Sequence, residues 1–305
     1  MCYKSSCGGV RKMKIVALDI GGTSIKSGLW VDDALENLKE RDTEALKGGE
    51  HVLQRAIELI SEYESFDAIG ISTAGQVNSK EGVIRYANEN IPGYTGMRIK
   101  ERLEERFKVP VVVENDVNAA AIGEAHFGGG REFNDFLCLT YGTGVGGAIV
   151  INKQIYTGAA FSAGEFGSMI IHPEDRIKGD YFSGCYEKYA STTALVARAK
   201  AYDERLNNGR TIFERIDESV IQDIVNGWLE EVVYGLTTLI HIFNPPCVVL
   251  GGGVLAQPYI LEKLKEILYT QIMPSFKNVV LKQAELGNQA GMLGVIHLAR
   301  GLEKE

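Results

Sequence analysis

The chain has 305 residues, too many for one hydrophobic core, and its length suits two lobes of about 100–200 residues each. Its formal net charge is −8, and its basic residues form no stripe along the sequence. No apolar run reaches the ~18 residues that a membrane-spanning helix needs. We therefore expect neither nucleic acid nor a membrane among the partners of this protein.

The five cysteines form no CxxC pair, and their odd number argues against a framework of disulfides. This usage is typical of the reducing cytoplasm, where we expect the protein to reside. Residues 1–12 are polar and lack the apolar stretch of a signal peptide. We expect them to form a flexible tail, with the first strand beginning near Met13.

The first part of the chain alternates short apolar runs with segments of helical apolar spacing. The runs predict strands, and the spaced segments predict helices. Strands are expected over residues 15–19, 25–31, 68–72 and 111–113, and helices over residues 51–63, 99–107 and 116–127.

The second part repeats this pattern, because each half opens with a strand, a glycine turn, a second strand and then helices. We therefore expect two related α/β lobes, the first over residues 13–118 with a returning helix at 291–305, and the second over 119–290. In the second part, strands are expected over residues 136–141, 146–151 (continuing through 153–156), 247–250 and 279–281, and helices over residues 187–202, 219–243, 258–269 and 292–302.

Three glycine-rich turns follow predicted strands, at residues 19–23, 142–147 and 251–253. Glycine lets backbone N–H groups approach anionic oxygens, so three such turns suit an extended polyphosphate. Each turn taken alone is equally compatible with a plain hairpin. The second also matches GxGxxG, but that fingerprint requires a helix to follow, and here a strand is expected. No GxxxxGK[ST] is present, which excludes a P-loop.

Two carboxylates occupy positions suited to phosphoryl transfer. Asp19 ends a strand beside the first glycine turn, where it could hold Mg²⁺ directly or through water, although a turn-capping role explains it equally well. Asp116 lies at a strand-to-helix junction, where a fixed carboxylate could accept the proton of an acceptor hydroxyl. The alternative for Asp116 is an ordinary helix N-cap.

Six segments, in order and spacing, resemble the ROK family (repressors, unknown reading frames and sugar kinases). The resemblance extends from about Lys14 to Ala299 and implies an actin-like (ribonuclease H-like) two-lobed α/β fold with a central cleft. It also implies transfer of the γ-phosphoryl group of ATP to a sugar hydroxyl. The segments are LDIGGT at 18–23 with Lys26, GISTAG at 70–75, NIPGY at 90–94 (Asn-Leu-Pro-Gly-Trp in the family), ENDVNAAA at 114–121, LTYGTGVGG at 139–147 and VLGGG at 249–253.

The resemblance assigns roles to individual positions. It makes Asp116 the catalytic base, and it implies ATP and Mg²⁺ as cofactors and a homodimer as the assembly. Two carboxylates that accept hydrogen bonds from neighbouring hydroxyls are a common way to hold a sugar. The implied sugar-binding residues are Gly75, Asn90, Asn115, Asp116, Glu165 and Glu187, and the implied nucleotide-binding residues are Asp19 (also the magnesium residue), Gly21, Gly22, Thr23, Lys26, Thr143, Gly144, Gly252 and Gly253.

The chain departs from the family where a structural zinc is usually bound. The family places a histidine at the position of Ser168 and three cysteines in a CxCGxxGC pattern, of which only Cys185 remains here. A structural zinc needs about four nitrogen or sulfur ligands, so we predict no zinc. A serine in place of histidine also opens space beside the anomeric carbon. A β-glucoside such as cellobiose could then be phosphorylated on its 6-hydroxyl, as could glucose.

Other functions compatible with the resemblance stay open. The family includes DNA-binding repressors, but only residues 1–12 precede the first motif, too few for a helix-turn-helix domain. A catalytically weak sugar-binding regulator is an alternative, as is a kinase for N-acylmannosamine or fructose. An ATPase or chaperone of the wider actin-like superfamily is another alternative, but it would lack the paired carboxylates Glu165 and Glu187.

Overall fold

The computed structural model describes residues 13–302. The expected tail at 1–12 and residues 303–305 of the returning helix lie outside the described residues. The chain divides into two compact units, which comprise residues 13–116 with 295–302 and residues 117–294. The division thus follows Asp116 and Gly294, whereas the sequence places the lobe boundaries after Asn118 and before Gly291.

The first unit is built on a five-stranded sheet in the order β3-β2-β1-β4-β7. The pairs β3–β2 and β2–β1 are antiparallel, and the pairs β1–β4 and β4–β7 are parallel. The strands are β1 (Ile15–Ile20), β2 (Ser24–Val31), β3 (Ala34–Asp42), β4 (Ala68–Thr73) and β7 (Val111–Asn115), and a separate two-stranded sheet is formed by β5 (Gln76–Asn78) and β6 (Val83–Tyr86).

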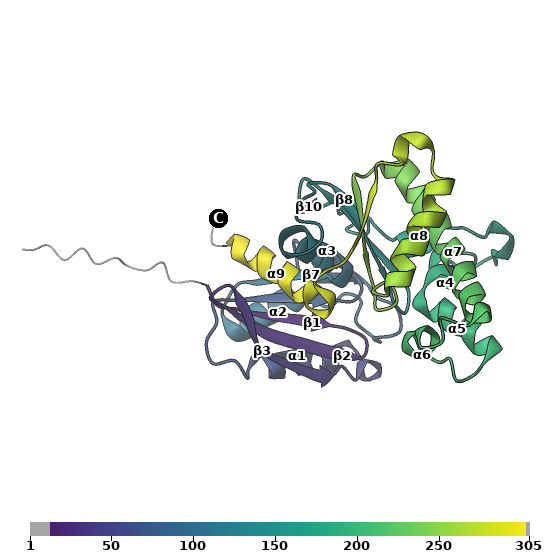
Figure 1. Cartoon of the computed structure of the whole chain (residues 1–305). Helices are drawn as coiled ribbons and strands as arrows, with labels where there is room; N and C mark the ends of the chain where they lie inside the picture. The colour runs from purple at the N-terminus through teal and green to yellow at the C-terminus, as the bar shows by residue number, and fades with distance from the viewer. Residues whose placement is uncertain (1–12, 303–305) are drawn as a thin grey trace, which may run out of the picture. The chain divides into compact units, whose positions relative to one another are not determined.

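Helices cover both faces of this first sheet (Figure 1). Helices α1 (Gly49–Ile60) and α2 (Ile99–Phe107) share one apolar cluster with Ile69 and Ile71 of β4. Helix α9 (Ala290–Gly301) returns to the opposite face. There a Cβ atom placed on Gly70 would lie 2.8 Å from Val295, so glycine at this position permits close packing of the helix on the sheet.

The second unit contains a sheet of the same topology, in the order β10-β9-β8-β11-β12. Its pairs β10–β9 and β9–β8 are antiparallel, and β8–β11 and β11–β12 are parallel, as in the first sheet. The expected pattern of two related lobes is therefore present in the two sheets. The strands are β8 (Phe136–Tyr141), β9 (Val145–Ile151), β10 (Gln154–Ile155), β11 (Cys247–Gly251) and β12 (Val280–Gln283).

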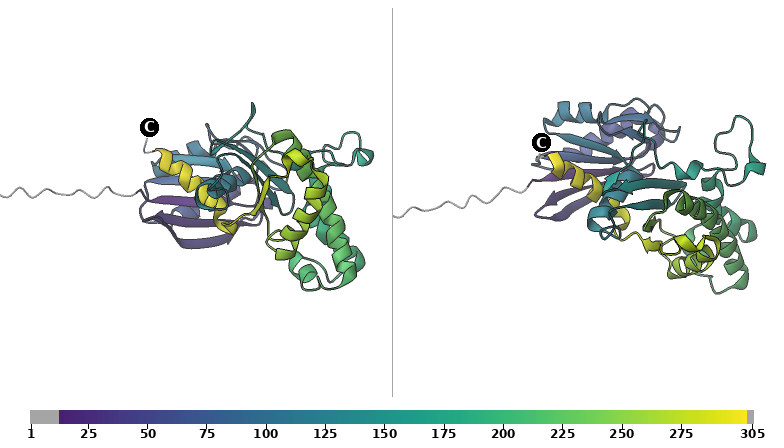
Figure 2. Two further views of the ribbon diagram at one scale, coloured as in Figure 1. Left: turned by 45° about the horizontal axis from the view of Figure 1, so that its top comes forward. Right: turned by 90° about the horizontal axis from the view of Figure 1, so that it is seen from above.

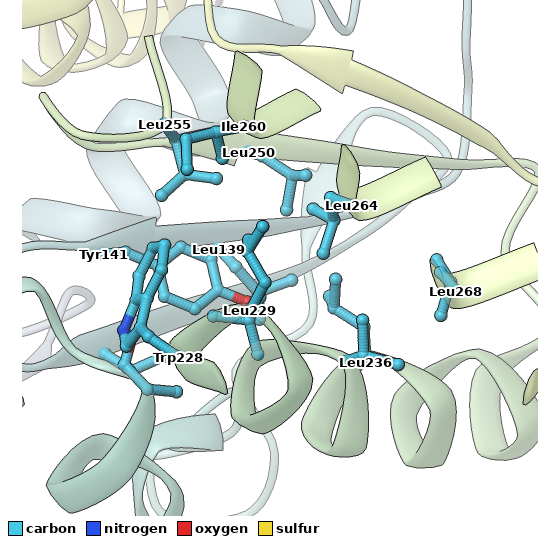
Figure 3. Packing of buried hydrophobic residues seen from close by; sticks show 14 of the residues in the cluster. Leu139, Tyr141, Trp228, Leu229, Leu236, Leu250, Leu255, Ile260, Leu264 and Leu268 are labelled. Atoms are coloured by element: carbon cyan, nitrogen blue, oxygen red, sulfur yellow. The ribbon is translucent and has the colours of Figure 1, made fainter. Parts of the chain in front are cut away.

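One face of the second sheet packs on helix α3 (Asp116–Phe127), and the other carries the largest core of the molecule. Helices α7 and α8 run side by side over that core (Figure 2). The Trp228 side chain is fully buried there, and its indole N–H donates to the carbonyls of Ala190 and Ser191 at 3.0 and 3.1 Å (Figure 3). The helices are α4 (Tyr186–Ala190), α5 (Thr192–Tyr202), α6 (Gly209–Phe213), α7 (Ser219–Phe243) and α8 (Pro258–Gln271).

The structure differs from the sequence-based elements at several places, including the unpredicted pair β5 and β6. Strand β3 was not predicted, because it is a charged edge strand in which most side chains are exposed. The single helix expected over 187–202 is wrong: Ser191 has an extended backbone and caps α5 by accepting the N–H of Ala194. The short helix α6 was also missed. None of the helices between residues 13 and 302 combines the length and apolar character that crossing a membrane requires.

Helices α3 and α9 approach each other through glycine. A Cβ atom on Gly294 would overlap the carbonyl of Ala119, and one on Gly123 would overlap the carbonyl of Ala290. Because the obstacles are backbone atoms, no change of rotamer can relieve such a clash. This close crossing holds α3, and with it the junction from which Asp116 projects.

We predict that Gly294→Ala destabilises the protein by about 2 kcal/mol or more through overpacking, which lowers the thermal midpoint by roughly 5 °C. Gly301→Ala is the matched control on the same helix, because a Cβ atom there has nothing within 4 Å. Thermal unfolding of the two variants checks the prediction. Equal midpoints for both would show that the crossing tolerates a methyl group.

Candidate active site

The turn between β1 and β2 is held by its own backbone and by one buried side chain. The N–H of Gly21 donates to the carbonyl of Ser24 at 3.0 Å, and the hydroxyl of Thr43 donates to the carbonyl of Gly21 at 2.6 Å. Gly22 and Thr23 are exposed, and a Cβ atom on Gly22 would meet nothing within 4 Å. The turn is therefore fixed in shape and open to an approaching anion.

Asp19 lies at the end of β1, directly before this turn. The Ser72 hydroxyl on β4 donates to Asp19 Oδ1 at 2.6 Å, and Lys26 is the partner of Asp19 in the β1–β2 register. Burial raises the pKa of Asp19, and the Ser72 hydrogen bond and the charge of Lys26 only partly oppose that rise. A buried carboxylate that is costly to ionise gains from a bound cation, so Asp19 suits Mg²⁺.

Three of the predicted residues come together where β4 and β7 end. The Asn115 amide donates from Nδ2 to the carbonyl of Gly75 at 2.9 Å and to Asp116 Oδ1 at 2.8 Å. Gly75 has φ +95°, and a Cβ atom there would lie 2.9 Å from the carbonyl of Tyr86. The amide thereby uses both of its N–H groups to fix Asp116 against the Gly75 turn.

Asn90 lies in the loop between β6 and α2, and its side chain is exposed. Its N–H donates to Asn88 Oδ1 at 3.1 Å, while the carbonyl of Pro92 accepts the N–H of Gly49 at 2.8 Å. The same loop contains Tyr94, which is buried and reaches Thr73 at the end of β4. The loop of Asn90 is thus anchored to the strand that leads into the Gly75 turn.

In the second unit, the turn between β8 and β9 is topologically equivalent to the turn at Gly21. The N–H of Gly142 donates to the carbonyl of Gly144 at 3.0 Å. Thr192 supports the turn from α5, because its N–H donates to Gly142 and its hydroxyl to Tyr141, both at 3.0 Å. Thr143 is exposed at the tip, and a strand follows, which confirms that the GxGxxG match is not a dinucleotide fingerprint.

Glu187, at the start of α4, lies against this second turn. A Cβ atom on Gly144 would be 2.5 Å from Glu187 Oε2, and one on Gly167 would be 3.3 Å from the same oxygen. Gly167 belongs to the 3₁₀ turn Phe166–Ser168, which the exposed Glu165 precedes. The structure therefore brings Glu187 together with Gly144 and with the segment that carries Glu165.

A pocket of about 1030 Å³ opens beside these residues within the second unit. It is large enough for a nucleotide-sized ligand. Thr143 and Gly253 line it, and Gly252 with φ +114° packs on the carbonyl of Tyr141, where a Cβ atom would overlap it. The rest of the lining comes from Tyr141, Gly142, Thr192, Thr193, Val196, Asn207, Asn208, Gly209, Arg210, Phe213, Glu214, Val254 and Gln257.

Sequence reasoning missed the wall of this pocket that α5, α6 and their connection provide. One local signal was available, because Asn208 and Thr211 form a capping box at the start of α6. Such a box predicts a helix start but carries no information about a ligand. Only the packing of α6 beside the second glycine turn identifies these residues as pocket lining.

The segment around Cys185, where the sequence departs from the pattern expected for a zinc site, is held by hydrogen bonds between protein groups. The Arg176 guanidinium donates from Nη1 to the carbonyls of Tyr181 and Ser183 at 3.1 and 2.7 Å, and the Ser183 hydroxyl accepts the N–H of Ile177 at 2.8 Å. Cys185 is buried with a free thiol. Within residues 13–302, no three His, Cys, Asp or Glu side chains are grouped to hold a metal ion.

His172 joins this segment to α7. Its Nδ1 lies 2.9 Å from Glu174 Oε1 and its Nε2 lies 2.8 Å from Glu231 Oε2, so both ring nitrogens face carboxylates. The hydrogen bond to Glu231 and then that to Glu174 raise the pKa of His172. Arg198 also binds Glu231, at 2.9 Å, and the Tyr189 ring lies 4.1 Å from the imidazole.

With this geometry established, comparison with known proteins identifies the family. The model of the ROK family matches residues 15–301. The chain belongs to the ROK family. The expected membership and the expected actin-like α/β fold are thereby confirmed.

Three related proteins illustrate the likeness. The β-glucoside kinase of Listeria monocytogenes is 32% identical over 93% of this chain and 97% of the relative. The glucokinase of Thermotoga maritima is 31% identical over 95% of this chain and 98% of the relative. The crystal structure of a ROK glucokinase from Streptomyces griseus with glucose and AMPPNP is 30% identical, with a TM-score of 0.79 over 94% of this chain and 99% of that one.

We predict that the His172 link stabilises the protein at low pH and weakens as pH rises. Folding raises the pKa of His172 above its unfolded value of about 6.5. The link therefore stabilises the protein fully at a pH below the unfolded pKa, and this stabilisation is lost as the pH rises through the higher folded pKa. Thermal unfolding of the wild type and of His172→Gln should therefore differ most near pH 6 and least near pH 8.5. A difference that grows with pH would contradict the sign.

Proposed function

We propose that the protein is an ATP-dependent sugar kinase that phosphorylates the 6-hydroxyl of glucose or of a β-glucoside. The observation that carries this proposal is the fixed carboxylate of Asp116, oriented by the Asn115 amide beside the Gly75 turn. The names of the relatives, β-glucoside kinase and glucokinase, agree with it.

In this proposal Asp116 accepts the proton of the acceptor hydroxyl while the hydroxyl oxygen bonds to the γ-phosphorus of ATP and ADP departs with the bridging oxygen. The Asn115 hydrogen bond to Oδ1 limits rotation of the Asp116 carboxylate. Orientation of this kind contributes to phosphoryl transfer because the protein acts mainly by positioning its reactants.

The nucleotide belongs to the pocket of the second unit. The exposed Thr143, with Gly144, would contact the phosphates, and Gly252 and Gly253 would lie beside the adenosine. In the first unit the turn of Gly21, Gly22 and Thr23 offers further N–H groups to phosphate, and Lys26 lies next to Asp19 in the register. Mg²⁺ held at Asp19 would supply charge neutralisation to the phosphate oxygens.

The residues proposed to bind the sugar are Gly75, Asn90 and Asn115 of the first unit and Glu165 and Glu187 of the second unit. Carboxylates accept strong, charge-assisted hydrogen bonds from hydroxyls. Glu187 also touches the Gly144 turn, so the same side chain would connect sugar binding with phosphate binding. Gly144→Ala would disturb both, since the new methyl group would collide with the Glu187 carboxylate.

We predict that Asp116→Asn lowers kcat by about 10²–10⁴-fold, because the amide cannot accept the proton. The KM for sugar should change much less, because the amide can still hydrogen-bond the acceptor. Coupled-assay kinetics of ADP release with a panel of sugars provide the measurement. Asp223 is exposed on α7, so Asp223→Asn is the charge-matched control and should keep the kcat and KM of the wild type. If Asp116→Asn kept wild-type turnover, Asp116 would not be the catalytic base.

The serine at position 168 predicts the preferred acceptor. Ser168 is exposed at the end of the 3₁₀ turn that follows Glu165, where the family has a larger histidine. We expect kcat/KM for cellobiose to exceed that for glucose by roughly tenfold, the scale on which a small change in the shape of a pocket discriminates between substrates. Ser168→His should shift the preference back toward glucose. A strong preference of the wild type for glucose would contradict the proposal that a β-glucoside is the preferred substrate. It would not contradict the proposed kinase activity.

A further inference from the structure

Tyr94 is a buried phenol in the loop that also carries Asn90. Only 1% of the residue is exposed, and its hydroxyl lies 2.7 Å from the hydroxyl of Thr73. A buried hydroxyl normally has a partner, because an unpaired one loses its hydrogen bonds to water. Here the partner is the last residue of β4, the strand that leads into the Gly75 turn.

The aromatic ring of Tyr94 is held independently of its hydroxyl. Met97 donates its N–H to the carbonyl of Tyr94 at 3.1 Å, and a Cβ atom on Gly49 would lie 2.8 Å from the Tyr94 ring. Pro92 in the same loop accepts the N–H of Gly49 at 2.8 Å. Removal of the hydroxyl alone should therefore leave the ring and the loop in place.

Thr73 connects this phenol to the residues of the candidate active site. It is the register partner of Asn115 across the β4–β7 pair, so the two side chains are neighbours on one face of the sheet. Its hydroxyl also lies 3.4 Å from the carbonyl of Ala74, the residue before Gly75. The turn at Gly75 is thus held both by Thr73 and by the Asn115 amide.

The carboxylate of Asp116 affects the pKa of the Tyr94 phenol. Burial raises the pKa of Tyr94 to about 12, the hydrogen bond with Thr73 partly offsets that rise, and the nearby Asp116 carboxylate adds to it. The phenol is therefore protonated throughout the neutral range and keeps a proton to donate. It is a neutral dipole within the electrostatic reach of the proposed base.

We propose that the Tyr94 hydroxyl is a positioning group for catalysis: through Thr73 it fixes the end of β4, against which Asn115 orients Asp116. The inference rests on the proposed function, because it takes Asp116 as the base. Tyr94 touches no reacting atom in this account and acts only through its neighbours.

The test compares Tyr94→Phe, Thr73→Val and the double variant. Each single change removes one buried hydrogen bond, so kcat should fall about fivefold to twentyfold. The KM for sugar should stay within about twofold, because the sugar-binding groups remain. The double variant should lose no more than the more severe single variant, since both changes break one hydrogen bond.

Tyr63→Phe is the matched control in the same unit. The Tyr63 hydroxyl lies 2.9 Å from the hydroxyl of the buried Ser27 on β2 and donates to the carbonyl of Asn37 on β3 at 3.1 Å, so this variant also loses phenolic hydrogen bonds, but none to β4 or β7. It should match the others in thermal stability and keep wild-type kcat. If Tyr63→Phe had a kcat as low as that of Tyr94→Phe, the loss of activity would reflect general destabilisation and the inference would be wrong. A change in the KM of Tyr94→Phe without a change in kcat would also overturn it.

Hydrogen exchange provides a readout that does not depend on activity. Tyr94→Phe and Thr73→Val should speed exchange in peptides containing Ala74–Gly75 and Asn115–Asp116, whereas Tyr63→Phe should not. Unchanged exchange there would overturn the positioning role even in an active enzyme. If the wild type phosphorylates no sugar, the proposed function fails, and exchange alone still decides whether Tyr94 orders these residues.

Discussion

The pair of hydrogen bonds donated by the Asn115 amide is the constraint on which the rest of the account depends. One joins Gly75 after β4, and the other joins Asp116 at the start of α3. A carboxylate at a helix start would normally serve as a cap, with its orientation set by the helix. Here a neighbouring amide, itself bonded to the turn that follows β4, also restrains that orientation. Ordinary strand and helix geometry thus holds a carboxylate in a restrained position, as the proposed catalytic base requires.

The common topology of the two sheets explains why glycine turns recur. In each sheet the first strand passes through a tight turn into an antiparallel second strand, at Gly21–Thr23 and at Gly142–Gly144. The parallel neighbour of that first strand also leads into a glycine turn, at Gly75 in one unit and at Gly251–Gly253 in the other. One architecture therefore yields one turn suited to sugar and three suited to a nucleotide, according to the side chains that surround each.

The segment between Glu165 and Glu187, for which the sequence predicts no zinc, is supported by contacts among protein groups. Arg176 and Ser183 bind its backbone, and His172 joins it to Glu231 of α7. These interactions restrain residues between Glu165 and Glu187, the two carboxylates proposed to clamp the sugar. The His172 bridge between two carboxylates thus supports this segment, and the raised pKa of His172 makes that support depend on pH.

Much of the fold and part of the site could be predicted from the sequence, for reasons that particular residues show. The apolar run at 111–113 followed by Asn115 and Asp116 predicts a strand that turns into a helix, and α3 indeed begins at Asp116. The charged strand β3 gave no such signal, because its edge position needs no apolar pattern. The α6 wall of the pocket and the Tyr94–Thr73 contact arise from packing between distant segments, which local patterns do not encode.

The central claim is that Asp116 receives the acceptor hydroxyl, and a crystal structure with a bound β-glucoside and AMPPNP tests it most directly. The account predicts the 6-hydroxyl within about 2.6–3.2 Å of the Asp116 carboxylate, with the Asn115 amide still bonded to Gly75 and Asp116. A sugar bound elsewhere, or an Asp116 carboxylate turned away from every sugar hydroxyl, would contradict it.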